Sequence, residues 1–411
     1  MANLPPEIWR LIFRNATFVQ DLVNATWDYD PNERIWDCWG SVEYRAPGAP
    51  QGYQSNQSVR TGSVEMATKL AIVAVCRKWR GIGVEYLYES IVIPTSMGNL
   101  GTLLEVVTTS HSDTTPGYGW WVKRIHICDK IVSIVRWHFD QLVAFMDHCP
   151  NLEIFSSPTD YSGMITYDDT RYRERLPRFL RSRYSLRRLD LFLTIYGGTG
   201  TINLAEMMPG VPLRSLGITV PQWYTDVDPQ PSFGQITTLT LLFSSAIQRF
   251  PSEWTLPSLQ NLALLQIDEY DMSLSMPFVT RHQKTITHLF LDIHTPADDV
   301  LFSLLACAPG LRSVAFSDVD LDVLCSLNGV ELPGLTHLGI CCPKGPWYIS
   351  RTREGLGKAL EKRCFPDIKT VRLLKEERSV GLTKVWKEMI ELCSFHQVRL
   401  EDMYGRAFIK G

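Results

Sequence analysis

The stretch LPSLQNLALL, residues 256–265, sets apolar side chains at Leu259, Leu262 and Leu264. The same spacing, in which two residues and then one residue separate three apolar positions, recurs from residue 122 onward. Side chains alternate between the two faces of a strand, so the last two apolar residues of each unit point together into a core. No unit can bury that apolar edge alone, and a stacked neighbour covers it. The pattern therefore predicts a stack of parallel strands.

Ten copies of the pattern run through the chain, and most successive copies lie 23 to 27 residues apart. This period and spacing are the leucine-rich-repeat signature. The position that usually holds Asn or Cys holds other residues, such as Thr194, Ser244 and His294, so we expect an irregular solenoid. The sequence predicts an α/β fold in which residues 94–411 form this solenoid. The copies are Val122-Ile125-Ile127, Leu186-Leu189-Leu191, Leu213-Leu216-Ile218, Ile236-Leu239-Leu241, Leu259-Leu262-Leu264, Ile286-Leu289-Leu291, Leu311-Val314-Phe316, Leu335-Leu338-Ile340, Ile368-Val371-Leu373 and Phe395-Val398-Leu400, with a degenerate copy at Leu152 and Phe155.

The segments between the repeats fit short helices. Residues 139–152 and 298–311 are amphipathic and end in Cys, Pro and the next repeat. A proline two residues before a repeat stops the preceding helix and favours extended chain. Such prolines are Pro150, Pro257, Pro309, Pro333 and Pro366.

The composition is that of an ordinary globular protein, and the net charge is not positive enough to favour binding to nucleic acids or acidic membranes. The chain has 45% hydrophobic and 21% charged residues and a net charge of -3. Neither a basic leader nor an apolar run of membrane length is visible, and ten cysteines without a CxxC pair favour reduced thiols. We therefore expect a cytoplasmic or nuclear protein without a membrane or nucleic-acid partner. Motifs for hydrolases, nucleotide sites or metal centres are missing, so we expect no enzyme activity, no cofactor and no metal.

The N-terminus contains a short, mostly apolar segment, LPPEIWRLIF, at residues 4–13. The prolines suit a helix start, and Ile8, Leu11 and Ile12 form one stripe while Trp9 and Phe13 form another. One stripe can pack inside the chain, and the other needs a second buried surface. A further helix and a shorter one are expected between residues 63 and 93, before a first strand, SIVI. Residues 24–62, rich in Gly, Pro, Asn and Ser, are expected to form an irregular insert.

Leu4-Pro5-x-Glu7 with Ile12-Phe13, followed by Val75-Cys76-x-x-Trp79, resembles an F-box, and the ending LYESIVI resembles fungal F-box proteins. The resemblance covers residues 1–93 and implies an all-α module that docks on a Skp-type adaptor of a cullin-RING ubiquitin ligase. The long insert between the two motifs departs from the usual F-box pattern. By this resemblance the chain is a non-catalytic substrate receptor, whose adaptor interface is formed or supported by Leu4, Pro5, Ile8, Ile12, Phe13, Val75, Cys76 and Trp79.

Two other interpretations of these features stay open. The N-terminal helices could simply cap the larger core, although cap helices need only one apolar side. The whole chain could be a leucine-rich-repeat interaction scaffold without any ligase association.

The outward positions of the strands are the candidate substrate-binding surface, because the repeats leave them free of the core. A covering helix, loop or tail is the alternative, above all for the apolar members. His288 and His337 occupy matching positions two repeats apart, roughly 10 Å, which is too far for a metal pair, so we expect exposed surface histidines. The candidates are Arg188, Asp190, Phe192, Leu265, His288, Phe290, Asp292, His337 and Arg372.

Residues 171–188 hold eight arginines against one glutamate. Guanidinium groups pair well with phosphate and carboxylate groups, so Arg178, Arg181 and Arg183 are candidates for binding an acidic or phosphorylated substrate segment. A solvated helix face balanced by Asp168 and Asp169 is the plainer alternative, and a nuclear-import patch or RNA contact is a weaker one.

Overall fold

The repeats fold into parallel strands, as the apolar spacing predicts. The computed structural model describes residues 4–17, 56–93, 100–108, 117–127, 136–156, 180, 184–191, 211–220, 233–243, 253–293, 298–317, 332, 334–341, 346–362, 364–375, 383–401 and 407–408. Two compact units divide between Leu213 and Arg214, within the repeats. The domain boundary expected at residues 93 and 94 lies inside the first unit and stays a prediction.

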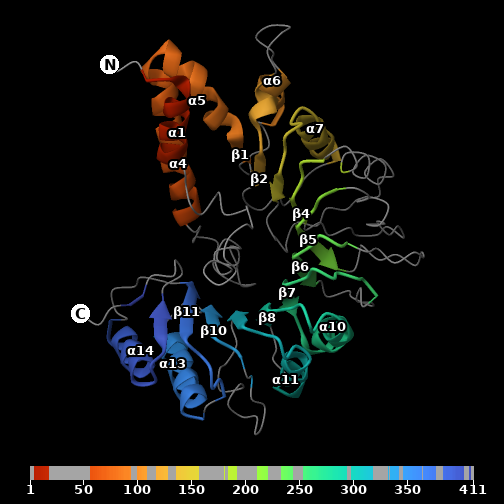
Figure 1. The fold of residues 1–411 in the computed structure, drawn as a ribbon, viewed down its shortest axis with the longest axis vertical. Coiled ribbons are helices and arrows are strands. Elements are labelled where there is room, and N and C mark those ends of the chain that lie inside the picture. Colours follow the sequence, from red (N-terminus) through yellow and green to blue (C-terminus); the bar gives the residue numbers. More distant parts are fainter. Residues whose placement is uncertain are drawn as a thin grey trace. The chain divides into compact units, whose positions relative to one another are not determined.

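Among the described residues, the first unit begins with three helices and continues into four strands. Figure 1 shows this order from α1 to β4. Parallel pairing joins β1 to β2, β2 to β3 and β3 to β4, so strand order follows chain order. Strand β1 follows α5 without a break, which ties the helices to the first repeat. The elements are α1 (Pro6–Thr17), α4 (Asn56–Val75), α5 (Arg77–Glu89), β1 (Ser90–Ile93), α6 (Leu100–Thr108), the 3-10 helix η2 (Tyr118–Trp121), β2 (Arg124–Ile127), α7 (Arg136–Asp147), β3 (Ile154–Ser156) and β4 (Arg188–Leu191).

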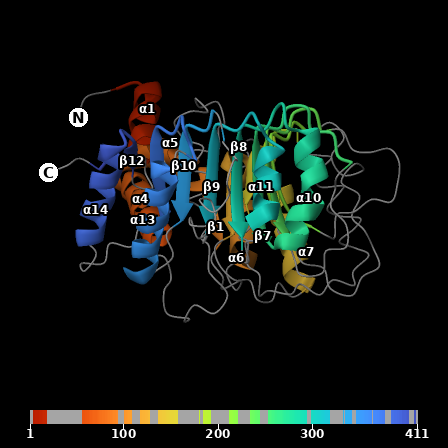
Figure 2. The same ribbon diagram turned by 90° about the horizontal axis from the view of Figure 1, so that it is seen from below.

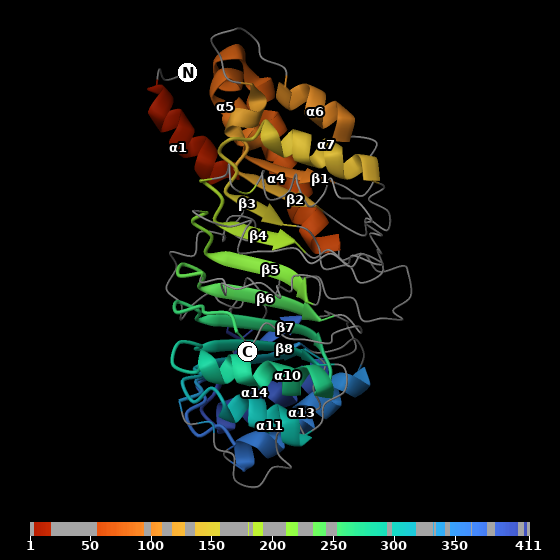
Figure 3. The ribbon, with the colours of Figure 1, turned by 90° about the vertical axis from the view of Figure 1, so that its right-hand side faces the viewer.

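In the part of the second unit that the structure describes, eight strands stack in chain order, and all of them pair in parallel (Figure 3). Its helices lie on one side of the strands, and β8, β9 and β10 run in the same direction (Figure 2). The elements are β5 (Ser215–Val220), β6 (Thr238–Phe243), β7 (Asn261–Ile267), α10 (Glu269–Arg281), β8 (His288–Ile293), α11 (Asp298–Ala306), β9 (Ser313–Ser317), β10 (His337–Cys341), α13 (Pro346–Glu361), β11 (Thr370–Lys375), α14 (Thr383–Phe395) and β12 (Arg399–Glu401).

The core of the repeats consists of the apolar positions named from the sequence. In residues 256–265, the side chains of Leu259, Leu262 and Leu264 are each 0% exposed. Their partners in register, such as Leu239 and Leu241 on β6, are equally buried. Stacked apolar columns therefore hold the strands together, and the α/β fold with N-terminal helices and an irregular leucine-rich-repeat stack is confirmed.

One boundary expected from the sequence is wrong. Helix α4 begins at Asn56, whereas the irregular insert was expected to continue to residue 62. The first residues of this helix are mostly polar, so they show no apolar period from which a helix could be predicted. Adding turns to an existing helix costs little compared with nucleating a new one, so the packed C-terminal half can extend toward its N-terminus. The rest of the insert up to residue 55 lies outside the described residues.

Candidate binding surfaces

Aromatic rings close the core of the N-terminal helices. Phe13 on α1 is 1% exposed, and its ring centroid lies 5.0 Å from that of Trp79 on α5 and 5.7 Å from that of Trp9. Ile72 of α4 and Tyr86 of α5 pack into the same cluster. Aromatic pairs at such separations stabilise a core beyond their buried area. Phe13 therefore supports the helical module from within, and the partly buried Trp79 packs against the same core.

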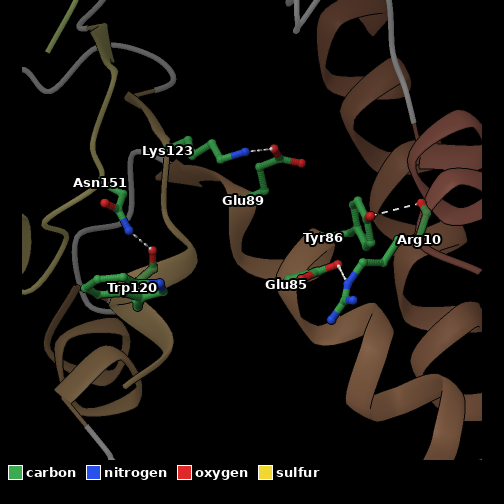
Figure 4. A network of polar contacts seen from close by, with 7 residues as sticks. All are labelled: Arg10, Glu85, Tyr86, Glu89, Trp120, Lys123 and Asn151. Carbon is green, nitrogen blue, oxygen red and sulfur yellow. Dashed lines mark hydrogen bonds and ion pairs between the residues drawn. The ribbon is translucent and has the colours of Figure 1, made fainter. Parts of the chain in front are cut away.

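Polar contacts fix α1 onto α5 beside this core (Figure 4). Arg10 Nε lies 3.0 Å from Glu85 Oε1, and the Tyr86 hydroxyl donates to the Arg10 carbonyl oxygen at 2.9 Å. Burial first, and then the neighbouring Glu85, raises the pKa of Tyr86 to about 12. The hydroxyl thus keeps its proton at physiological pH and remains a donor to α1.

Away from this aromatic core, α1 and α4 expose large apolar side chains to solvent. Ile8, Leu11 and Ile12 are 42%, 57% and 42% exposed, and their i, i+3, i+4 spacing places them on one side of α1. Helix α4 packs against α1 and exposes Met66 and Leu70, which are four residues apart and share one side of that helix. It also exposes Val75, which is nine residues from Met66 and therefore lies on another side of α4. Clustered exposed apolar surface on a soluble protein marks an interaction site more often than scattered residues do. We call five of these residues the α1–α4 apolar stripes: Ile8, Leu11, Ile12, Met66 and Leu70.

Two of the residues expected at the adaptor interface, Ile8 and Ile12, belong to these stripes, and a third, Val75, is exposed on another side of α4. Pro5 is exposed and Leu4 half-buried at the start of α1. The sequence expectation omitted Leu11, Met66 and Leu70. The helical period of residues 4–13 already contained Leu11, but no sequence signal decided which side of each helix faces inward.

The end of α4 that carries Val75 has a positively charged border. Cys76 is exposed at the N-cap of α5, and its Sγ accepts a hydrogen bond from the Trp79 backbone N–H at 3.5 Å. The first turn of α5 then exposes three cationic side chains, Arg77, Lys78 and Arg80. An apolar surface with this border suits a partner with an apolar centre and an acidic rim.

Contacts within the first unit also join the helices to the first repeats. Lys123 Nζ lies 2.8 Å from Glu89 Oε1, and Asn151 Nδ2 donates to the Trp120 carbonyl oxygen at 2.8 Å (Figure 4). Tyr88 and Tyr118 stack with ring centroids 4.5 Å apart. These contacts make the helices and the first strands one packed structure.

Most of the residues expected to form the substrate-binding surface on the strands are buried. Six of its candidates are at most 7% exposed, so the prediction that they form an accessible surface is wrong. His337 and Arg188 are half-buried. Arg178, Arg181, Arg183 and Phe192 lie outside the described residues. The six buried candidates are Asp190, Leu265, His288, Phe290, Asp292 and Arg372.

Ion pairs explain the burial of Asp190 and Arg372. Both Nε and Nη2 of Arg188 lie 2.7 Å from Asp190 Oδ2. On β11, Arg372 donates to Glu401 Oε2 of β12 from Nε at 2.9 Å and from Nη2 at 2.7 Å. A buried charge is tolerated when its partner is close and hydrogen-bonded. The repeat pattern alone could not show these pairs, because their members lie on different strands or two positions apart.

Leu265 and His288 are buried for other reasons. The pairing of β7 with β8 shifts register between Leu264 and Ile267, so strict alternation cannot place Leu265 on the open face. His288 contacts Thr287, whose Oγ1 lies 2.7 Å from His288 Nδ1. Burial above all, with His337 and Arg312 nearby, lowers the pKa of His288 to about 3. The expectation of an exposed histidine at position 288 is therefore wrong.

Comparison with known proteins assigns the chain to no family. No protein-family model matches the chain, and no curated protein matches it. A solved structure described as "Crystal structure of TLR13-ssRNA13 complex" is 12% identical with a TM-score of 0.35. The alignment covers 72% of this chain and 47% of that one, so the chain spans about half the length of that structure. Among the helices of the described residues, none has the length and apolarity needed to cross a bilayer.

Proposed function

We propose that this chain is the substrate-recognition subunit of a Skp–cullin–F-box ubiquitin ligase. One observation carries the proposal: the helices bearing the F-box-like residues keep aromatic rings inside and expose the α1–α4 apolar stripes. A soluble chain gains free energy when another polypeptide covers such stripes, at about 25 cal/mol for each Å² of apolar surface removed from water. The Skp-type adaptor is the partner that the Leu4-Pro5-x-Glu7 and Val75-Cys76-x-x-Trp79 motifs imply.

The chemistry of this role is proximity rather than catalysis. The N-terminal helices would bind the adaptor, and through it the cullin-RING ligase. The repeats would hold a target protein, which raises the concentration of the target near the ubiquitin-loaded enzyme. Strand stacks of this kind are general binding scaffolds, which supports a protein-interaction role for the repeats.

Co-expression with a Skp-type adaptor tests the proposal. Wild-type chain should co-purify with the adaptor as a one-to-one complex. Ile8→Asp and Leu70→Asp place a charge within the apolar stripes of α1 and α4, and each should weaken binding by at least about tenfold, because an unpaired charge would be desolvated. Surface plasmon resonance with immobilised adaptor measures the change.

Tyr184→Asp is the matched control, because Tyr184 is 77% exposed and lies outside the N-terminal helices. It should bind the adaptor like wild type. Equal losses in Tyr184→Asp and Ile8→Asp, or no complex with wild type, would contradict the adaptor role. In the second case a repeat scaffold without ligase association would be the better account.

A further inference from the structure

Helix α10 of the second unit has a buried titratable side chain at each end. Asp271 lies in its first turn and is 6% exposed, and His282, the residue that ends the helix, is 5% exposed. The helix packs against α11 and β7. Burial disfavours the charged form of any ionisable group. In mildly acidic solution the two ends are therefore neutral for opposite reasons, because Asp271 holds a proton and His282 lacks one.

Two carboxyl groups meet at the N-terminal end of α10. Asp268 Oδ1 accepts a hydrogen bond from the Asp271 backbone N–H at 2.8 Å, and Asp271 Oδ2 accepts one from the Asp268 backbone N–H at 3.4 Å. Burial first, and then the charge of Asp268, raises the pKa of Asp271 to about 7. The sequences of the adjacent elements supply no cation, because β7 is uncharged and α11 begins with Asp298 and Asp299, while Glu269 adds a further acid to the same turn. Docking of this end of the helix therefore takes up a proton.

A histidine closes the C-terminal end of α10. His282 Nε2 lies 3.1 Å from the Trp254 carbonyl oxygen, and the imidazole packs against Phe278 with ring centroids 4.6 Å apart. Because a carbonyl oxygen only accepts, Nε2 carries the hydrogen. Burial above all lowers the pKa of His282, with Arg281 adding to the effect and the hydrogen bond to Trp254 opposing it. Arg281 is itself paired with Glu253 at 3.0 Å. Docking of this end of the helix therefore releases a proton.

We propose that α10 is a proton-compensated clamp, in which docking of the helix binds one proton at Asp271 and releases one at His282. The exchange balances where a free aspartate is ionised and a free imidazole is protonated, between about pH 4 and 6.5. The helix then stays docked on the repeats during an acidification that would alter its docking through either group alone. This inference goes beyond the adaptor role and does not depend on it.

The two contributions to docking run in opposite directions with pH. The pKa of Asp271 is higher in the docked helix, so its contribution is complete below about pH 4 and is lost as pH rises toward 7. The pKa of His282 is lower in the docked helix, so its contribution is complete above about pH 6.5 and is lost as pH falls below that value. Either group alone changes the equilibrium constant for opening by up to about tenfold per pH unit.

Hydrogen exchange of the full chain, followed by mass spectrometry in residues 272–281, tests the clamp without any adaptor. Opening constants are compared from about pH 5 to 6.5 at fixed ionic strength, after correction for the intrinsic exchange rates. In wild type the opening constant should change by less than about threefold over this range. Asp271→Asn should open more as pH falls, by up to about tenfold per pH unit, because only the histidine still titrates. His282→Gln should open less as pH falls, because only the aspartate still titrates.

Three features of the design separate proton exchange from simple damage to the helix. Asparagine and glutamine keep a polar atom close to the original one, so both variants preserve the hydrogen bonds at the helix ends. The double variant Asp271→Asn with His282→Gln should recover the flat profile of wild type, which a purely structural loss could not produce. Glu269→Gln is the matched control, because Glu269 is an exposed carboxylate in the same turn, and its profile should follow wild type.

The proposal would be overturned by a wild-type opening constant that changes about tenfold per pH unit, by single variants whose profiles slope in the same direction, or by a slope in Glu269→Gln. If a variant failed to fold, 13C NMR of labelled aspartate carboxyl groups in wild type decides instead. One carboxyl group should titrate near pH 7, and the absence of such a group would equally overturn the clamp.

Discussion

His288 is an imidazole kept neutral by its position at the start of β8. Burial disfavours its charged form, and His337 and Arg312 add positive charge nearby, so its pKa falls to about 3. An unfolded chain would restore the ordinary pKa of about 6.5. The unfolded state therefore binds the proton first as pH falls, and this residue lowers folding stability between about pH 6.5 and 3.

Replacing His288 with Gln should remove that acid sensitivity while keeping a polar side chain. At 1.36 kcal/mol per pH unit, wild type should lose about 2 kcal/mol of unfolding free energy at pH 5 relative to pH 7.5 through this residue alone. Urea denaturation of both proteins at the two pH values measures the difference. An identical pH dependence in wild type and His288→Gln would show that burial of this imidazole has been overstated.

Single residues were the scale at which the sequence predicted least. Phe13 and Ile12 are adjacent and both apolar, yet Phe13 is 1% exposed and Ile12 is 42% exposed. Nothing in the N-terminal pattern ranked one helix side above the other, because the choice depends on the aromatic partner Trp79 more than sixty residues away. The Arg372–Glu401 pair was hidden for the same reason, since it joins two different strands.

At the scale of elements the sequence was a better guide. The ten regular copies, the degenerate copy near Phe155 and the expected first strand SIVI all form strands. Each copy is specified locally, by apolar residues that any neighbouring copy can cover, so no distant contact has to be known. The start of α4 at Asn56 escaped prediction because its first residues carry no apolar period.

The 3-10 helix η2 depends on a glycine. A methyl group added at Gly119 would overlap the carbonyl oxygen of His148, which follows helix α7. Because this neighbour is backbone, it cannot rotate away. Gly119→Ala should destabilise the protein by about 1–3 kcal/mol, measured as a lower urea midpoint.

Gly81 in α5 is the control for that substitution, because the same methyl group would meet nothing within 4 Å there. Gly81→Ala should stabilise the protein by about 0.5–1 kcal/mol, through the higher helix propensity of alanine. If both substitutions shifted the midpoint in the same direction, close packing between η2 and the end of α7 would not be the cause.

At the scale of the whole molecule, binding would fall on two different places. The α1–α4 apolar stripes of the first unit would take an adaptor, and the repeats would hold a target protein. A receptor needs separate surfaces, because it must bind its ligase and its target without exchanging them.

Amide hydrogen exchange of the full chain, with and without a Skp-type adaptor, tests the central claim most directly. Slower exchange should appear in residues 6–17 and 66–75 when adaptor is present, because a docked partner shields these helices and suppresses their local opening. Exchange in residues 287–293 and 368–375 should stay the same. Unchanged exchange in α1 and α4 at saturating adaptor would contradict the assignment of the exposed stripes as the docking site.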